Sequence, residues 1–422
     1  MRTDYIEKEI SCKDDFDPGS LDADIARQKI IDAIRPVTDT EILPLRESIG
    51  RILGQEILSP LNVPSGTNSA MDGYAVSGDD IPESGTRELK LVGTTMAGQP
   101  LNNVVKPGEC VRIMTGAIMP EGTDTVIMQE HVQQTGDSVL IDHTTGKGAN
   151  VRQAGEDIAI NDRVFSPGIR LTPAEIGVIA SLGIGKVRVV RKIKVAFFST
   201  GDELRSIGET LESGQIYDSN RYSLYGMLIR LGAEIIDLGV VRDERMALKK
   251  ALESAAEQAD VVITSGGVSV GEADYVKEML ESIGEINFWK VAMKPGRPLA
   301  FGHINNTLFF GLPGNPVSVM VTFYQFVQPA LRYLMGEDDI DTQTFKVRCK
   351  SKLKKRPGRV EYQRGILQQD DNGELVVYKT GAQGSGILRS MAQANCFIIL
   401  PMESDTVMPD CLVDVQPFFG LV

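Results

Sequence analysis

The sequence predicts an α/β multidomain protein. Its 422 residues correspond to roughly three domains at about 150 residues per domain. Between about residues 190 and 335, strand patterns alternate with helix patterns, which is typical of a doubly wound, mainly parallel sheet with helices on both faces. Because β-type runs lie on both sides of this region, we also expect a β-rich inserted domain, a discontinuous helical and extended domain, and a small C-terminal β-barrel or sandwich.

The N-terminal segment predicts a tail followed by a helix. Residues 1–19 are polar and acidic, and we expect them to form a mobile tail. Ser20 is expected to cap a helix. The apolar residues that follow it recur at helical spacing: Ala23, Ala26, Ile30 and Ile34.

A second helix is expected after Thr172, with Pro173 at its first position and Glu175 completing a capping box. The two helices flank a stretch of short β-type runs and turns. The simplest arrangement is therefore one domain interrupted by another. We assign residues 20–60 plus 150–190 to a discontinuous domain and residues 61–149 to the β-rich insertion.

Residues 191–337 are assigned to the α/β domain. We expect strands at 194–198, 234–238, 261–264, 286–291, 299–302 and 307–311, and helices at about 219–231, 243–257, 273–283 and from 315. Gly232 and Gly284 are placed to end the first and third of these helices. Ligands of such sheets bind beyond the carboxyl ends of the strands.

Residues 338–422 return to β patterns and form the expected C-terminal barrel or sandwich. The dipeptide Asn372-Gly373, preceded by Asp371, is a strong hairpin signal between the apolar runs 366–367 and 375–378.

Composition excludes several classes of protein. The net charge is 44 − 57 = −13, and an acidic surface repels phosphate backbones, so we expect no nucleic-acid partner. No apolar run approaches the roughly 18 residues of a transmembrane helix, and the first residues lack the apolar core of a signal peptide. The 5 cysteines and 3 histidines suit neither a disulfide framework nor a zinc ribbon, so we expect a reducing cytoplasm.

A glycine-rich turn at Thr264–Tyr275 follows an expected strand and opens an expected helix. Gly266 and Gly267 let the backbone approach a ligand closely, and Ser269 follows them, so the turn suits a phosphate or another oxyanion. A connection without a ligand is the alternative. The same residues match the Gly-x-Ser-x-Gly pattern of serine hydrolases, but Ser269 lies too far from the strand end, and His303 falls in an expected hairpin.

Cationic residues cluster in a chain that is otherwise acidic. Lys290, Lys294 and Arg297 fall within eight residues, around a rigid Pro-Gly turn. The segment Gly311–Ser318, with Pro313, Pro316 and Ser318, is a second strand-to-helix turn. We expect both to bind an anion; a solvated charged edge is the plainer interpretation.

Three acids also follow expected strands: Glu203, Asp243 and Asp274. Because the carboxyl ends of parallel strands meet at one edge, these carboxylates are candidate Mg²⁺ ligands. Each alone is better explained as a helix cap or a surface acid. In the β-rich segment, Asp72, Thr115, Arg152 and Asp157 lie in turns that composition alone describes as loops.

Six motifs resemble those of the molybdopterin molybdenumtransferases, which comprise the bacterial MoeA proteins and the E domains of homologues such as gephyrin. The motifs are Asn68–Ala75, Met114–Ala117, Ser199–Leu204, Ser265–Tyr275, Lys294–Pro298 and Gly311–Ser318. The resemblance covers about residues 20–422 in collinear order, and it leaves the first 19 residues unexplained.

The resemblance implies four domains, of which the α/β domain is of the molybdopterin-binding type and the last is a β-barrel. It implies an elongated homodimer in which residues 20–60 plus 150–190 form the dimerisation domain. The active site then lies between the α/β and C-terminal domains of one subunit and the β-rich region of its partner. It also implies a reaction: adenylylated molybdopterin and molybdate give molybdenum cofactor and AMP, with Mg²⁺ or a similar cation. The adenylyltransferase that makes this substrate and the molybdoenzymes that accept the product are further implied partners.

Residue roles carry over by motif. Glu203, Asp243 and Asp274 match acids of the nucleotide and metal site. Lys290, Lys294 and Arg297 match the basic rim for phosphate and molybdate, with Ser318 nearby. Asp72, Thr115, Arg152 and Asp157 match the group supplied by the other subunit, and Asp72 joins the three acids as a catalytic candidate. Two C-terminal loops resemble molybdate-contacting loops, which indicates Arg359 and either Ser385 or Ser390.

Two other functions compete with this one. The first is a molybdopterin adenylyltransferase, whose family shares this α/β domain but whose phosphate turn usually has the sequence Gly-Gly-Thr-Gly. The second is a non-catalytic scaffold, against which the intact acids argue. Molybdate and tungstate have the same charge and nearly the same size, so the sequence does not distinguish the two metals.

Overall fold

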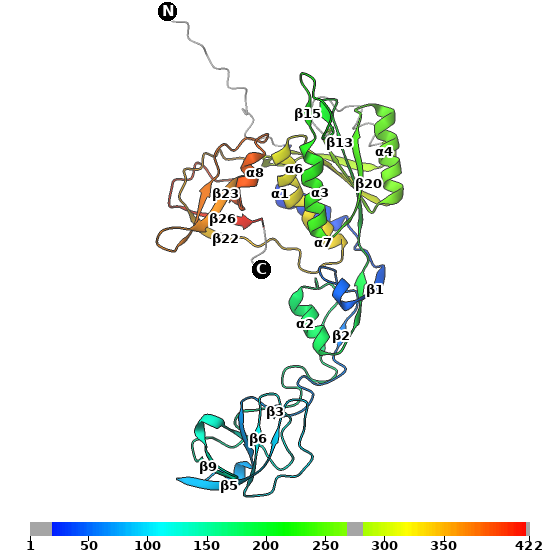
Figure 1. The fold of residues 1–422 in the computed structure, drawn as a ribbon. Coiled ribbons are helices and arrows are strands. Elements are labelled where there is room, and N and C mark those ends of the chain that lie inside the picture. Colours follow the sequence, from blue (N-terminus) through cyan, green and yellow to red (C-terminus); the bar gives the residue numbers. More distant parts are fainter. Residues whose placement is uncertain (1–18, 268–281, 419–422) are drawn as a thin grey trace, which may run out of the picture. The chain divides into compact units, whose positions relative to one another are not determined.

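The computed structural model describes residues 19–267 and 282–418 (Figure 1). Most of the expected tail, most of the helix expected at 273–283, and the site candidates Ser269 and Asp274 lie outside the described residues. The chain divides into two compact units. The first comprises residues up to Glu41, Gly50–Ile52 and the chain from Val190 on, and the second comprises Ile42–Ile49 and Leu53–Val189.

A six-stranded sheet forms the centre of the first unit, in the order β16-β13-β17-β21-β20-β18. Its parallel part consists of β16 (Glu234–Val241), β13 (Lys194–Thr200), β17 (Val261–Ser265) and β21 (Thr307–Leu312). The strands β20 (Pro298–Ile304) and β18 (Glu285–Lys290) continue it with antiparallel pairings. The expected mainly parallel sheet is therefore confirmed, with a mixed edge.

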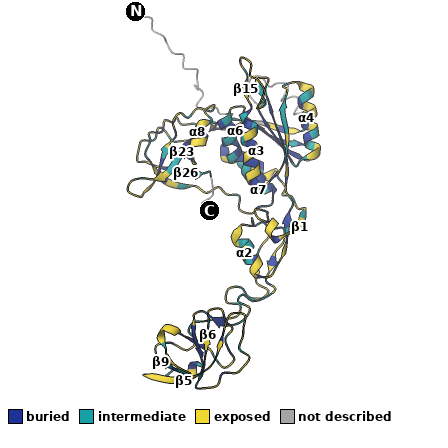
Figure 2. Ribbon diagram, viewed as in Figure 1, coloured by how far each residue is buried: buried dark blue, intermediate teal, exposed yellow. Residues whose placement is uncertain are grey.

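Both faces of this sheet are covered, as Figures 1 and 2 show. Alternate residues of β13 point to opposite faces. Val195 and Phe197 pack with α3 (Ser219–Leu231), α6 (Pro316–Thr322), α7 (Gln328–Leu334) and the π-helical turn η4 (Phe323–Val327) between them. Ala196 and Phe198 pack with α4 (Arg245–Gln258) on the other face. The strands are buried on both sides, which explains their continuous apolar sequence.

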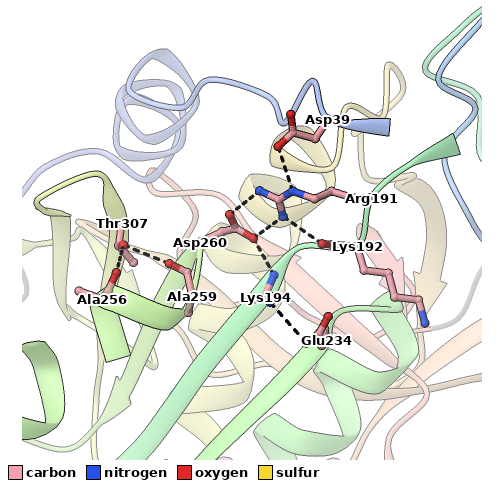
Figure 3. Close-up of polar contacts among 9 residues, drawn as sticks. All are labelled: Asp39, Arg191, Lys192, Lys194, Glu234, Ala256, Ala259, Asp260 and Thr307. Carbon is pink, nitrogen blue, oxygen red and sulfur yellow. Dashed lines mark hydrogen bonds and ion pairs between the residues drawn. The ribbon is translucent and has the colours of Figure 1, made fainter. Parts of the chain in front are cut away.

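Charged side chains hold the amino ends of two strands of the sheet together (Figure 3). Arg191 precedes β13 and donates two hydrogen bonds of 2.8 Å to the carboxylate of Asp260, which precedes β17. The Lys194 N–H donates to the same carboxylate at 2.7 Å. Asp39, from the segment after the first helix, accepts a further bond from Arg191 at 3.3 Å. This cluster lies at the strand ends where the parallel strands begin.

The C-terminal part of the first unit is a closed five-stranded barrel, β23-β24-β22-β26-β25, completed by pairing of β23 with β25. Its strands are β22 (Phe345–Cys349), β23 (Val360–Gln369), β24 (Leu375–Lys379), β25 (Cys396–Leu400) and β26 (Leu412–Pro417), and α8 (Arg389–Gln393) precedes β25. The expected Asp371–Gly373 hairpin joins β23 to β24. A short strand, β19 (Met293–Lys294), pairs in parallel with β23 and joins the barrel to the loop after β18.

The second unit is β-rich. A six-stranded sheet has the order β7-β4-β6-β5-β9-β8. Its strands are β4 (Gly73–Val76), β5 (Thr86–Thr95), β6 (Glu109–Ile113), β7 (Thr125–Met128), β8 (Gln133–Thr135) and β9 (Ser138–Asp142). The unit also contains two short strand pairs, β2 (Ile57–Leu58) with β11 (Arg163–Phe165) and β3 (Asn68–Ser69) with β10 (Val151–Arg152). Its helix α2 (Pro173–Ser181) has the expected capping box.

The first helix, α1 (Ala23–Asp32), differs from expectation in two ways. Its cap is Asp22, whose Oδ1 accepts from the backbone N–H groups of Asp24 and Ile25, and not Ser20. A carboxylate accepts hydrogen bonds from the free N–H groups, and its negative charge interacts favourably with the positive N-terminal end of the helix dipole. The apolar face of α1 packs into the core of the α/β unit, whereas we expected the helix in the discontinuous domain. The strand pair of β1 (Thr40–Pro44) with β12 (Lys186–Val190) follows it in the chain.

Within the described residues, no helix has both the length and the apolar character that crossing a bilayer requires.

Candidate functional site

A cavity of about 960 Å³ lies within the first unit. It is lined by the loops that follow β13, β16, β17, β18 and β21, by the start of α3, and by the residues just before β23 and α8. The predicted site residues among its lining are Glu203, Asp243, Gly266, Gly267, Lys294, Arg297, Pro313, Pro316, Ser318, Arg359 and Ser385.

Strand register explains why these residues meet. Thr200 at the end of β13 pairs with Val241 of β16, and Ser265 of β17 pairs with Leu312 of β21. The antiparallel pairing of Lys290 with Pro298 brings the loop between β18 and β20 to the same edge. Acids, glycines and cations that are far apart in the chain therefore surround one cavity, as sequence reasoning expected for the carboxyl edge of a parallel sheet.

Gly266 allows two strand ends to approach each other. Its φ is +92°, and a Cβ at this position would lie 2.3 Å from the carbonyl oxygen of Thr200. Its N–H donates to the carbonyl of Leu312 at 3.1 Å. Only glycine fits this position, because an L side chain suits neither the backbone angle nor the space.

The acidic side of the cavity is formed by Glu203 and Asp243. The Glu203 carboxylate folds over Gly201, where a Cβ would lie 2.7 Å from its Oε2. Glu203 is exposed and Asp243 half-buried. Carboxylate oxygens are the donors that Mg²⁺ prefers, but among the described residues no cluster of three or more histidine, cysteine or acidic side chains is arranged for a metal. The third expected ligand, Asp274, lies outside the described residues.

The basic side of the cavity is formed by Lys294, Arg297 and Arg359. The Lys294 Nζ lies 3.4 Å from Oε1 of Glu361 on β23. Lys290, which we expected in the basic rim, does not line the cavity; it is exposed at the end of β18, and its carbonyl accepts from the Leu21 N–H.

The loop before α8 contributes Gln383, Gly384, Ser385, Gly386 and Leu388 to the cavity. Arg364 of β23, 1% exposed, holds this loop: its Nη2 donates to the Gly384 carbonyl at 3.1 Å and its Nε to the Ser390 Oγ at 3.1 Å. Burial lowers the pKa of Arg364 to about 10. On its other side, the loop accepts from Val317 at the start of α6, through the Ser385 carbonyl. Ser385 therefore lies at the cavity, whereas Ser390 is buried against Arg364 and does not line it.

Several lining residues were not among the sequence candidates. Asp218 and Asn220 at the start of α3 are both buried, and the Asn220 Nδ2 donates to the Gly314 carbonyl at 2.7 Å. Asp218 caps the helix through the Arg221 N–H. Its position before an expected helix is a capping signal, and it gave no indication of the cavity. Tyr217 and Gln383 carry no motif that marks them, and Asn315 lies within the Gly311–Ser318 motif but was not singled out.

A second group of predicted residues lies in the second unit. Asp72 Oδ1 accepts from both the N–H and the hydroxyl of Thr115, each at 2.7 Å. These bonds lower the pKa of Asp72 below its ordinary value. Arg152 on β10 pairs with Asn68, four residues before Asp72. Asp157 lies farther along, where its N–H donates to the Val63 carbonyl.

Family models match almost the whole chain. The MoeA N-terminal region (domain I and II) matches residues 21–183, a probable molybdopterin binding domain matches 196–333, and the MoeA C-terminal region (domain IV) matches 346–418.

The chain belongs to the MoeA family. It is 45% identical over 404 residues to the molybdopterin molybdenumtransferase of Haemophilus influenzae, which covers 95% of this chain and 100% of that protein. The corresponding enzyme of a Nostoc species is 40% identical, over 86% of this chain and 85% of that one. Among solved structures, the molybdopterin biosynthesis MoeA protein of Pyrococcus horikoshii has a TM-score of 0.82 and 29% identity, over 94% of this chain and 100% of that one.

Membership in the MoeA family accounts for the fold described above, including the C-terminal barrel. It also establishes the activity, which is that of a molybdopterin molybdenumtransferase in molybdenum cofactor biosynthesis.

Proposed function

We propose that the cavity at the carboxyl edge of the sheet binds adenylylated molybdopterin together with molybdate, releases AMP and delivers molybdenum cofactor. The observation that carries this proposal is that one cavity is lined by acids and by cations from opposite ends of the strand order. Glu203 and Asp243 follow β13 and β16 at one end, and Lys294 and Arg297 follow β18 at the other, beside Arg359 of the barrel. A nucleotide-bearing substrate with a bound cation needs the first, and a doubly charged oxyanion needs the second.

On the basic side, molybdate is a tetrahedral dianion that needs cations and N–H donors. Lys294 and Arg359 offer ammonium and guanidinium donors. Ser385 in the loop before α8 and Ser318 in the first turn of α6 line the same cavity. The substrate supplies the dithiolene sulfurs, which replace oxygen ligands of the metal. The two thiol protons leave with one such oxygen as water, unless that oxygen passes to the AMP phosphate, and the exchange transfers no electrons. The protein therefore needs neither a cysteine nor a histidine at the metal.

On the nucleotide side, the turn Gly266–Gly267 and the Pro313 and Pro316 turn bring backbone close to the phosphates. The pyrophosphate P–O bond breaks, AMP leaves, and its phosphate gains an oxygen from molybdate or water. Glu203 and Asp243 would hold Mg²⁺, because their oxygens line the cavity and suit a hard cation. When bound, Mg²⁺ neutralises pyrophosphate charge and favours AMP as a leaving group.

The active form is proposed to be a cytoplasmic homodimer. Support comes from the family resemblance, in which Asp72, Thr115, Arg152 and Asp157 act on the substrate bound by the other subunit. The enzyme that supplies adenylylated molybdopterin and the apoenzymes that take the product are the proposed transient partners.

The experiment is AMP release from adenylylated molybdopterin with molybdate and Mg²⁺. Asp243→Ala is expected to reduce the cation-dependent rate by about 100-fold or more, since it removes charge stabilisation at the reacting phosphates. Glu234→Ala is the matched control, because Glu234 is an exposed acid at the opposite end of the same strand. Unchanged turnover in Asp243→Ala, with far-ultraviolet dichroism like that of the unmodified chain, would contradict the proposal.

A further inference from the structure

The barrel strand β23 begins beside the basic side of the cavity, and its alternate residues face the same way. Arg359 immediately before the strand lines the cavity. Glu361 and Gln363 follow at intervals of two, so they share its face of the strand. Tyr362 points the other way, into the apolar core.

The Glu361 carboxylate is fixed. The residue is 7% exposed, and its Oε2 accepts from the Gln363 Nε2 at 3.1 Å. The same amide nitrogen lies 3.0 Å from the Lys354 carbonyl, to which it also donates. A buried carboxylate is costly unless it is paired with a cation. The negative charge of Glu361 is therefore held at a fixed position behind the cavity wall.

Lys294 is the cation beside it. Its backbone pairs in register with Glu361, through β19 and β23. Its side chain is 50% exposed, and its Nζ lies 3.4 Å from Glu361 Oε1. That distance exceeds the roughly 2.7–2.9 Å of a strong charge-assisted bond. The ammonium is thus held near Glu361 but keeps donors for a second oxygen.

A second cation lies near Glu361. Lys355, 4% exposed, donates to the carbonyls of Arg356, Met402 and Ser404 at 2.9–3.2 Å. Burial lowers the pKa of Lys355, while the charge of Glu361 acts in the opposite direction. The positive charge of Lys355 therefore continues to stabilise the Glu361 carboxylate when Lys294 donates to an anion.

We propose that Glu361 is a positioning residue for the oxyanion: it tethers the Lys294 ammonium at the cavity wall so that the remaining donors face bound molybdate. This inference rests on the proposed function, which places molybdate at the basic side. If charge alone mattered, removing the carboxylate would strengthen molybdate binding, because a carboxylate near the site repels a dianion. The tether predicts that removing the carboxylate weakens molybdate binding.

The test is titration calorimetry of the full-length protein with molybdate, together with AMP-release kinetics at varied molybdate. Glu361→Gln is expected to raise the molybdate Kd and KM by about fivefold, the size of a partly exposed ion-pair contribution. The kcat at saturating molybdate should change less than about twofold, since the reacting groups are intact. Glu361→Asp retains the charge on a shorter side chain and should fall between the two.

The matched control is Glu403→Gln. Glu403 is exposed, and its charge acts on Lys355 as that of Glu361 does, but it does not contact Lys294. Its molybdate Kd should equal that of the unmodified protein. If Glu361→Gln fails to fold, the comparison uses Glu361→Asp, and Lys294→Met is compared with Lys294→Met/Glu361→Asp. The added change should leave the Kd unaltered, because a tether without its lysine has nothing to position.

The outcomes separate the two proposals. A Kd in Glu361→Gln that is unchanged or lower, in a background that binds molybdate normally, overturns the role of Glu361 and leaves the proposed function intact. Failure of the unmodified protein to bind molybdate overturns the oxyanion site itself and this inference with it.

Discussion

Arg191 and Asp260 form a two-bond ion pair at the amino edge of the sheet, with Nη1 to Oδ2 and Nη2 to Oδ1 both at 2.8 Å (Figure 3). The cavity lies at the opposite edge of the same strands. The pair therefore ties β13 to β17 without touching the chemistry, and stability and activity should separate when it is broken.

Asp260→Asn is expected to lower the free energy of unfolding by about 1–3 kcal/mol, since the partly buried Arg191 keeps only the longer contact with Asp39 as an ion pair. The KM for molybdate should not change. Urea unfolding and AMP-release kinetics measure the two effects. A changed KM with normal stability would contradict the separation of the two edges. Lys346→Met, which breaks an exposed pair with Asp414, is the control and should cost less than about 1 kcal/mol.

The same pair gives stability a pH dependence. Burial opposes ionisation of Asp260, but hydrogen bonds from Arg191 and the Lys194 N–H outweigh it and lower the pKa of Asp260 below its ordinary value. A depressed pKa contributes stability above the unfolded pKa of about 3.9, and that contribution is lost as pH falls through the folded pKa. The difference in unfolding free energy between the unmodified chain and Asp260→Asn should therefore shrink below about pH 4.

Gly266→Ala is expected to damage both fold and site. The added methyl group meets the Thr200 carbonyl, and φ of +92° is unfavourable for alanine, so a loss of about 1–3 kcal/mol is expected. Because the strand end must move, AMP release should also slow. Gly226→Ala on α3 is the control: nothing lies within 4 Å of its Cβ, and alanine favours a helix by up to about 1 kcal/mol. Equal effects at the two glycines would be evidence against the close approach described here.

Sequence patterns predicted the α/β region well, because its signals are local. The helix at 219–231 ends at Gly232, whose φ of +82° requires no side chain, and the buried strands are continuous apolar runs. The edge at which Glu203, Asp243 and Lys294 meet followed from strand direction alone. In contrast, the packing of α1 on the α/β core depends on contacts distant in sequence, and no local pattern specifies it.

For the other site residues, the sequence did not distinguish between neighbouring residues of the same type. Lys290 and Lys294 are equally basic, but only the second follows the strand end and pairs with β23. Ser385 lies in the loop before α8 and Ser390 in α8 itself, five residues on, and only Ser390 is buried against Arg364. Asp218 and Asn220 are residue types expected at the start of a helix. Helix capping therefore explained them, and nothing in the sequence indicated that they line the cavity.

The serine pair offers a matched test. Ser385→Ala is expected to raise the molybdate KM by about three- to tenfold, because it removes a hydroxyl at the cavity. Ser390→Ala should instead lower the unfolding free energy by about 1–2 kcal/mol, since Arg364 Nε loses its acceptor. Kinetics at varied molybdate and urea unfolding measure both variants. A Ser390→Ala variant that alters KM more than Ser385→Ala would reverse the assignment made from their burial.

Mixing two inactive variants tests the proposed homodimer. Asp72→Ala removes the acid held by Thr115, and Lys294→Met removes a cation of the cavity. If the group containing Asp72 acts on substrate bound by the other subunit, a mixed dimer has one site with both residues intact. After subunit exchange, activity should recover to about a quarter of that of the unmodified protein, because half of the dimers are mixed and each has one of two sites. If both groups instead serve a site within one chain, mixing restores nothing, although light scattering still shows a dimer.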